Sequence, residues 1–238
     1  MFDALTLPDP PSSTIRRVSR REVHNYLIDG EGLTVEFKRQ FTSPEKIAKE
    51  MIALANTKGG VILFGVNDDG SVVGVESEKS ELSEIEHTAQ FLVEPPLEIR
   101  CDVVRWDGQN DVVVVTIPES TNKPHGLVEY DASGKRINAQ YYNGFVRVAD
   151  KSVQASSEVM KVMRSKRPDA PPLRIAIGYN EKRLFEYLHS NERVTVGEFA
   201  NLINISRRRA SKILVDLVRA GTILLHTNET TDYYTLAV

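Results

Sequence analysis

"ANTKGGVILFGVNDDG", residues 55–70, combines the end of a helix, a glycine pair, an apolar run and a turn signal within sixteen residues. Its first letters end a predicted helix that begins near Pro44 and repeats apolar residues at helical spacing. Gly59 and Gly60 allow the chain to turn tightly from that helix into the next element. "VILFGV" has the length and the apolar composition of a buried strand. Because "NDDG" is a turn signal and "SVVGV" (71–75) is a candidate return strand, we expect a buried β-hairpin here.

Further helices and hairpins flank this stretch. Upstream, Ser19 is a candidate N-cap for a helix that ends at Asp29-Gly30, and "LTVEF" (33–37) has a strand pattern. Downstream, the patterns predict a helix over about residues 80–93 and then a hairpin, in which "LEIRCDVVRW" and "VVVVTIP" are joined by the turn "DGQND". Two more strands are predicted, near 127–130 and in "YYNGFVRV", followed by a helix in "SSEVMKVMR". Since hairpins imply antiparallel pairing, the predicted fold class is α+β: a mixed, hairpin-rich sheet with flanking helices.

"RSKRPDAPPLR", residues 164–174, interrupts this pattern with three prolines and four basic residues, which is typical of an exposed connector. Beyond it we expect a helix over residues 180–189, a second helix opened by the capping-box pair Thr195 and Glu198, a third in "SRRRASKILVDLVRAG", and a strand pair. This order is that of a winged helix-turn-helix domain. The predicted divisions are an N-terminal arm (1–18), the α+β domain (19–165), a linker (166–179) and the winged helix (180–238).

Composition and charge limit the classes of function. The 238 residues are 41% hydrophobic and 26% charged, and no apolar run approaches the roughly 18 residues that a membrane helix needs. The N-terminus lacks a signal-peptide pattern, so we expect a cytoplasmic protein without a membrane partner. The single Cys101 excludes an intramolecular disulfide and a cysteine-rich zinc site. Because the net charge is −3, nucleic-acid binding would have to come from local basic patches.

The third predicted helix of the C-terminal unit carries such a patch. Its apolar residues share one face, Arg208, Lys212 and Arg219 lie nearly opposite, and Arg207 and Arg209 lie in the N-terminal turn. Helix-turn-helix proteins insert these positions into the major groove of DNA, where arginine binds guanine edges or phosphates. Two plainer interpretations stay open: a solvated helix face, or a winged helix that serves only for dimerisation.

"EGLTVEFKRQ", residues 31–40, places two glutamates beside a basic pair. Glu31 and Glu36 could bind a metal, whereas Lys38 and Arg39 could hold a phosphate. Asp68, in the "NDDG" turn, could also contact a metal. The alternative is that Glu36 and Lys38 share a strand face and make structural or phosphate-ordering contacts. The glycines at 59–60 do not form a phosphate loop, because they end a helix and lack the required lysine spacing.

Four stretches together resemble the Schlafen AlbA_2 domain: "EGLTVEFKRQ", "EMIALANTKGGVILFGVNDDGSVVGV", "NKPHG" and "YYNGFVRVADKSVQAS". The resemblance covers about residues 20–165 and implies a DNA-binding domain of the kind found in bacterial regulators. Winged-helix modules often follow this domain in bacterial proteins. In the "FVRV" strand of this family the arginine usually points outward, so Arg147 is predicted either to contact nucleic acid or to form a salt bridge.

The same resemblance also implies an enzymatic alternative. Some animal Schlafens are metal-dependent endoribonucleases, and their acidic residues match Glu31, Glu36 and Asp68 by motif position. Clustered carboxylates can hold Mg²⁺ or Mn²⁺, which activates water against a phosphodiester. The animal enzymes use a duplicated domain, so a single copy would need to dimerise to complete an RNA groove.

The interpretation that we carry forward is a DNA-binding protein acting as a transcriptional regulator, without a cofactor and as a homodimer. Its expected partner is double-stranded DNA, with RNA as a second candidate. The alternative function is a divalent-metal nuclease acting on RNA or DNA. A third interpretation, a protein-interaction module, also stays open.

Overall fold

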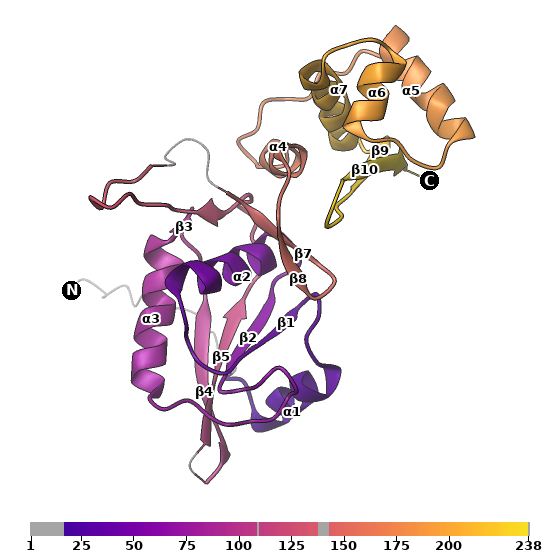
Figure 1. The fold of residues 1–238 in the computed structure, drawn as a ribbon. Helices are drawn as coiled ribbons and strands as arrows, with labels where there is room; N and C mark the ends of the chain where they lie inside the picture. Colours follow the sequence, from indigo (N-terminus) through magenta and orange to yellow (C-terminus); the bar gives the residue numbers. More distant parts are fainter. Residues whose placement is uncertain (1–16, 109, 138–142, 238) are drawn as a thin grey trace, which may run out of the picture.

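A four-stranded mixed sheet forms the centre of the N-terminal domain (Figure 1). The structure is a computed structural model that describes residues 17–108, 110–137 and 143–237. Parts of three predictions lie outside the described residues: residues 1–16 of the arm, Gln109 of the turn, and the start of the "YYNGFVRV" strand. The strands lie in the order β1, β2, β5, β4, with the bounds β1 Val35–Lys38, β2 Gly60–Phe64, β4 Arg100–Asp107 and β5 Asn110–Ile117.

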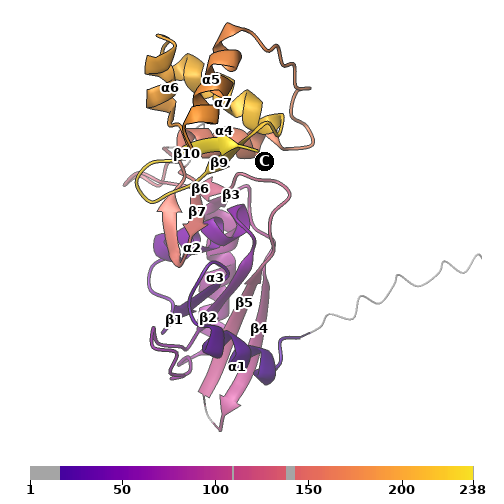
Figure 2. The same cartoon turned by 90° about the vertical axis from the view of Figure 1, so that its right-hand side faces the viewer.

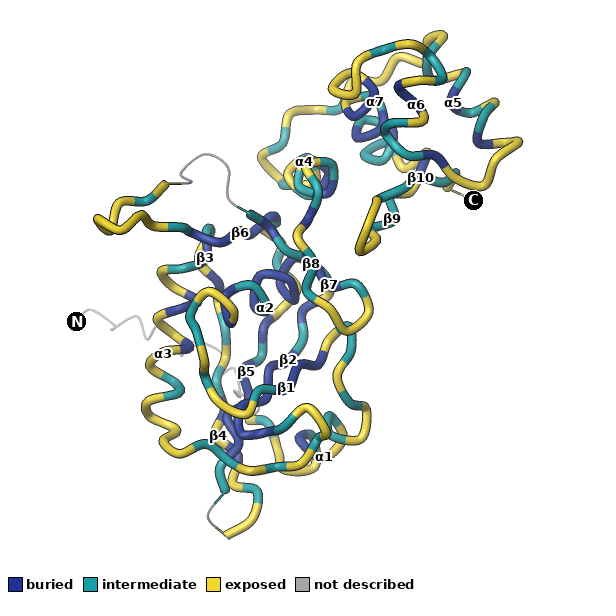
Figure 3. The backbone as a smooth tube through the Cα atoms, in the orientation of Figure 1, coloured by how far each residue is buried: buried dark blue, intermediate teal, exposed yellow. Residues whose placement is uncertain are grey.

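Helices cover both faces of this sheet. The buried residues of α2 (Pro44–Asn56) and α3 (Glu78–Phe91) share one hydrophobic cluster with Ile62 and Phe64 of β2. Val23 of α1 (Arg20–Asp29) belongs to a cluster on the other face. The result is a three-layer arrangement in which the two central strands are buried on both sides (Figures 2 and 3).

Two short strand pairs and one helix complete the domain. The strand β3 (Val93–Glu94) pairs with β6 (Gly126–Leu127), and β7 (Phe145–Val148) pairs antiparallel with β8 (Lys151–Gln154). The helix α4 (Ser157–Ser165) begins at the N-cap Ser156, whose side chain accepts a hydrogen bond from the backbone of Val159. Residues 166–178, all of which the structure describes, then contain no helix or strand.

The C-terminal unit has its own hydrophobic core, which includes Leu184, Phe199, Leu214 and Tyr234. The predicted order of three helices and a strand pair is confirmed, and Thr195 and Glu198 form the predicted capping box. No helix in the described parts of the chain is both long and apolar enough to cross a membrane. The bounds are α5 Tyr179–Ser190, α6 Val196–Leu202, α7 Arg207–Arg219, β9 Ile223–His226 and β10 Tyr233–Leu236.

The fold class α+β is confirmed. The turn predicted at "NDDG" is present, but the return strand predicted after it does not form. Residues 71–75 make one isolated bridge, between Val66 and Val72, and backbone hydrogen bonds from Val73 and Gly74 to the carbonyl oxygen of Gly65. Instead, β2 pairs in parallel with β1 and antiparallel with β5. The physical reason is that β2 is buried on both faces and needs a full-length strand on each edge, and the α2 crossover makes the β1 pairing parallel. The strands β3 and β8 were not predicted.

The "ANTKGG" motif joins α2 to the rest of the domain. The side-chain amide of Asn56 donates to the carbonyls of His125 and Phe145, at 2.9 Å each, and its Oδ1 accepts from the backbone N–H of His125 at 2.8 Å. Gly60 has φ +157°, and a Cβ there would lie 2.2 Å from the carbonyl oxygen of Thr34. The motif is therefore a structural junction, in agreement with the rejection of a phosphate loop.

The "NKPHG" loop provides the other side of this junction. The imidazole of His125 is buried, with Nδ1 2.7 Å from the carbonyl oxygen of Pro95 and Nε2 2.6 Å from Oγ of Ser120. Burial lowers the pKa of His125, so the ring is held neutral. His125 is a core contact.

We expect Asn56→Ala to lower the free energy of unfolding by about 2–3 kcal/mol, because it leaves the backbone groups of His125 and Phe145 unpaired in the interior. Urea denaturation measures the change. Lys58→Ala, an exposed position in the same motif, is the control and should stay within about 0.5 kcal/mol of the wild type. Equal stability of the two variants would contradict this account of the motif.

Candidate functional site

Arg147 lies in the interior of the N-terminal domain, with a side chain that is 0% exposed. Its Nη1 donates to Glu36 at 2.8 Å, to Glu50 at 2.9 Å and to Oγ of Ser152 at 3.2 Å. Its Nη2 donates to the carbonyl oxygens of Gly32 and Asp150 at 2.6 and 2.9 Å. Of the two roles that the sequence leaves open for Arg147, the structure shows the salt bridge, and no part of this guanidinium faces a ligand surface.

Glu36 is the carboxylate that holds this arginine. It is 6% exposed, and its second oxygen accepts a hydrogen bond from the ammonium group of Lys38. Lys38 also donates to the carbonyl oxygen of Phe37 at 3.0 Å. Glu36 and Lys38 therefore pair on one strand, as in the structural alternative above, and the charge of Lys38 is largely compensated.

Glu31 and Asp68 lie close to this pair on the exposed side. The backbone N–H of Phe37 donates to Oε1 of Glu31 at 2.9 Å. Desolvation raises the pKa of Glu31 above its ordinary value, and the negative charges of Glu36 and Asp68 raise it further. The three carboxylates that were matched to the nuclease motif are therefore near enough to interact electrostatically.

These carboxylates do not form a metal-binding set as they stand. Among the residues that the structure describes, no group of three or more His, Cys, Asp and Glu side chains is arranged to hold a metal ion. One oxygen of Glu36 faces Lys38 and the other faces Arg147, so the positive charge that a metal would supply comes from side chains. Binding of Mg²⁺ or Mn²⁺ to Glu36 would require Lys38 to move away. The metal site stays a prediction.

The basic residues at the start of α7 are in a different position. Arg207, Arg208, Arg209 and Lys212 are all exposed. In the parts of the chain that the structure describes, none of these four side chains forms an ion pair or a hydrogen bond. The helix begins at the N-cap Ser206, and its opposite face is buried in the core of the C-terminal unit. Four uncompensated positive charges therefore meet solvent within two turns of one helix.

The other two basic residues predicted as contacts lie apart from this group. Arg219 ends α7, is half-buried, and donates to the carbonyl oxygen of Pro171 in the connector. Arg39 is exposed and lines a small pocket of about 200 Å³ together with Glu76 and Glu81. Acidic neighbours weaken the attraction of Arg39 for a phosphate.

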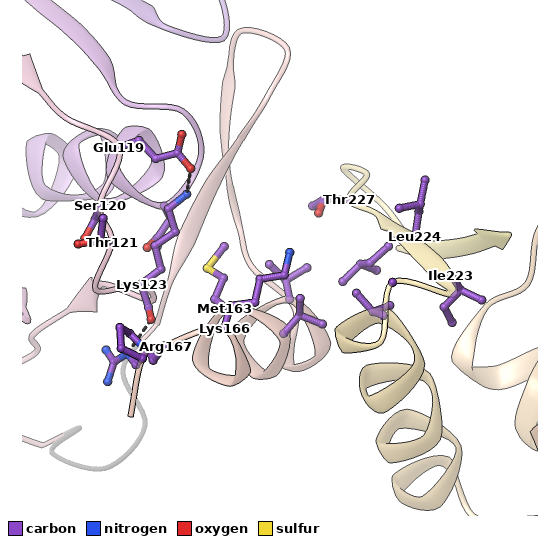
Figure 4. Close-up of a pocket in the computed structure, with 17 residues that line it drawn as sticks. Glu119, Ser120, Thr121, Lys123, Met163, Lys166, Arg167, Ile223, Leu224 and Thr227 are labelled. Carbon is purple, nitrogen blue, oxygen red and sulfur yellow. Dashed lines mark hydrogen bonds and ion pairs between the residues drawn. The ribbon is translucent and has the colours of Figure 1, made fainter. Parts of the chain in front are cut away.

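A larger hollow of about 1000 Å³ lies between α4, the loop at 119–123 and β9 (Figure 4). Its wall is mainly aliphatic, and Lys123 on one side bonds to Glu119 at 2.6 Å. Arg167 donates to the carbonyl oxygen of Lys123 at 2.6 Å, so it supports the loop. None of the residues predicted as site residues lines this hollow.

A family model described as "Schlafen, AlbA_2" matches residues 31–156, more than half of the chain. The chain belongs to the Schlafen AlbA_2 family. The match includes Glu31, Glu36, Asp68 and Arg147, and it ends at the N-cap of α4. The C-terminal unit lies beyond the AlbA_2 match.

Solved structures with limited similarity to the chain include two of bacterial origin. The DIP2311 protein from Corynebacterium diphtheriae has 16% identity and a TM-score of 0.42, covering 67% of this chain and 30% of its own. The N-terminal domain of a RecG-related protein from Nitrosomonas europaea has 18% identity and a TM-score of 0.39, covering 68% and 96% respectively. The chain therefore spans less than a third of the length of the first of these proteins. No curated protein matches it.

Two partners of Arg147 in the AlbA_2 domain are absent from the sequence-based prediction. Glu50 lies on α2 and Ser152 on β8, and Oγ of Ser152 donates to Oε2 of Glu50 at 2.5 Å. Both residues lie in stretches that carry the family resemblance, Glu50 at the start of "EMIALANTKGG" and Ser152 in "YYNGFVRVADKSVQAS", but neither stretch by itself indicates a contact with Arg147. Only the packing of α2 against β7 and β8 brings them together.

We expect Arg147→Met to destabilise the AlbA_2 domain by about 3–5 kcal/mol, because it leaves Glu36 and Glu50 without their cation in a poorly solvated site. Arg39→Met removes the same charge from an exposed position and should change stability by less than about 0.5 kcal/mol. Urea unfolding followed by circular dichroism compares them. If both variants unfold at the wild-type midpoint, Arg147 does not hold this domain together.

We expect Glu31→Gln to stabilise the protein by about 0.5 kcal/mol at pH 7, since the amide keeps the hydrogen bond from Phe37 and removes repulsion from Glu36 and Asp68. The folded-state pKa of Glu31 is raised above its ordinary 4.5, so ionisation of Glu31 lowers stability as the pH rises past that value. The advantage of the variant should therefore vanish as the pH falls below about 4. Thermal unfolding at pH 7 and pH 3.5 measures it, and an advantage independent of pH contradicts the electrostatic cause.

Proposed function

We propose that this AlbA_2 protein binds duplex DNA and acts as a cytoplasmic transcriptional regulator. The observation that carries the proposal is the exposed, uncompensated group of Arg207, Arg208, Arg209 and Lys212 at the N-terminal end of α7. Three helices followed by a strand pair suit a winged helix-turn-helix domain, in which α7 would be the recognition helix. Membership of the AlbA_2 family supports binding to nucleic acid.

The electrostatics explain how an acidic protein could bind DNA. The net charge of −3 gives no general attraction, so affinity must come from the local field of α7. Arginine side chains at the first turn of a recognition helix can bind guanine edges or adjacent phosphates, and Lys212, one turn later, can bind a phosphate. The apolar face of α7, with Ala210, Leu214 and Leu217 buried, keeps the helix rigid during binding.

The AlbA_2 domain offers less to the phosphate backbone than its motif suggests. Lys38 is paired with Glu36, which leaves the exposed Arg39 as the contact that we propose on this surface. A homodimer would place two copies of α7 on successive half-sites, which is how helix-turn-helix proteins gain affinity and specificity. RNA remains a second candidate ligand.

The test is an electrophoretic mobility shift with labelled duplex DNA over a series of salt concentrations. Wild-type protein should bind with an affinity that falls steeply as salt rises, and the double variant Arg208→Ala, Lys212→Ala should lower the salt slope by about 2. The control double variant Arg174→Ala, Lys182→Ala removes the same charge from exposed residues outside α7 and should bind like the wild type. Equal losses in both double variants would indicate a dependence on total charge only and would remove α7 from the proposal.

One observation keeps the nuclease as a second candidate: Glu36 and Asp68 lie close enough to Glu31 for their charges to raise its pKa. The same gel, run with Mn²⁺ and with EDTA on duplex DNA and structured RNA, tests it. Cleavage that needs Mn²⁺ and is lost in Glu31→Gln would make the carboxylates catalytic, since this substitution retains the local hydrogen bond. Salt-sensitive binding without cleavage leaves the regulator as the function.

A further inference from the structure

The helix α4, which directly follows the AlbA_2 match, packs against α7. The ammonium group of Lys161 on α4 donates to Oγ of Ser211 at 3.0 Å and lies 3.6 Å from Glu158. Ser211 is only 2% exposed, although it lies on the flank of α7 next to the basic face. A charged residue from outside the C-terminal unit is therefore held beside the helix that we propose as the DNA contact.

A groove of about 440 Å³ runs between these two helices. The side chains that line it are cationic or small, and no carboxylate is among them. They are Lys161, Ser206, Arg208, Arg209, Lys212 and Val215. Its surface is mostly apolar, since the aliphatic stems of the long side chains and the isopropyl group of Val215 contribute to it.

The positive charge in this groove is only slightly compensated. Arg208, Arg209 and Lys212 have no ionic or hydrogen-bonded partner among the described residues. Lys161 is 46% exposed, and its ammonium group has three N–H donors. One donor is directed to Ser211 and one toward Glu158, so one remains for a ligand. Cations gathered in a concave site with a low-dielectric floor attract an anion more strongly than the same charges on an open surface.

We propose that this groove binds a backbone phosphate of duplex DNA and that Lys161 is one of its ligands. The inference rests on the proposed function and extends it. The phosphate site then consists of Arg208 and Lys212 on α7 together with Lys161 on α4. The cationic groups suit the phosphodiester oxygens, and the apolar surface suits the adjacent deoxyribose. DNA binding then depends on the docking of α4 against α7 and not on the C-terminal unit alone.

Lys161→Ala in the full-length protein tests the proposal by the mobility shift described above. Loss of one phosphate contact should lower the salt slope by about 1 and weaken binding several-fold, to a similar extent on any duplex sequence. Lys161→Arg keeps the charge and should retain most of the affinity. Arg164→Ala is the matched control, because it removes one exposed charge from the same helix outside the groove, and its slope should equal that of the wild type.

A purely structural role of Lys161 predicts different results. Ser211→Ala removes the hydrogen bonds that Ser211 makes with Lys161 and Glu158 on α4 but leaves the charge of Lys161 in place. If Lys161 binds phosphate, Ser211→Ala keeps the wild-type salt slope. If Lys161 only anchors α4, Ser211→Ala lowers the salt slope as much as Lys161→Ala does, and the proposal is wrong.

The remaining outcomes separate this inference from the proposed function. One outcome is that binding depends on Arg208 and Lys212 but is equal in Lys161→Ala and Arg164→Ala. Lys161 is then not a phosphate ligand, whereas the proposed DNA binding through α7 is unaffected. If the wild-type protein binds no duplex, both fail together. Thermal unfolding of each variant confirms that the comparison is between folded proteins.

Discussion

The buried guanidinium group of Arg147 is the interaction on which the rest of the structure depends. It joins Glu36 on β1, Glu50 on α2 and the β7–β8 pair through one planar set of donors. A buried arginine is tolerated only when carboxylates and carbonyls satisfy it, so these elements must assemble together. The chain enters α4 two residues after the end of β8, and α4 packs against α7.

The arrangement of charge separates structural from surface roles. In the AlbA_2 domain, the acidic and basic residues of the "VEFK" strand neutralise one another and the buried arginine. In α7, basic residues of similar number face solvent without partners. Basic residues thus stabilise the fold of the AlbA_2 domain, whereas those of α7 in the C-terminal unit are available to bind an anion. The net charge of the chain conceals this difference because it averages over both.

Local signals in the sequence predicted most of the individual elements. Ser19 and Thr195 act as the expected N-caps, since a cap hydrogen bond involves residues only three positions apart. The error at "NDDG" has the opposite cause. A buried strand such as β2 has the same apolar pattern whichever strands flank it, so its sequence cannot specify a hairpin over pairing with β1 and β5.

From the sequence alone, the helices, most of the strands and the family could be predicted, because each of these depends on short-range periodicity or on motif spacing. Only the tertiary structure decided what the charged residues do. Arg147 and Glu36 are 111 positions apart, and Lys161 and Ser211 are 50 apart. Whether an arginine is buried against a carboxylate or exposed to a ligand depends on which distant segments pack beside it, and no local pattern carries that information.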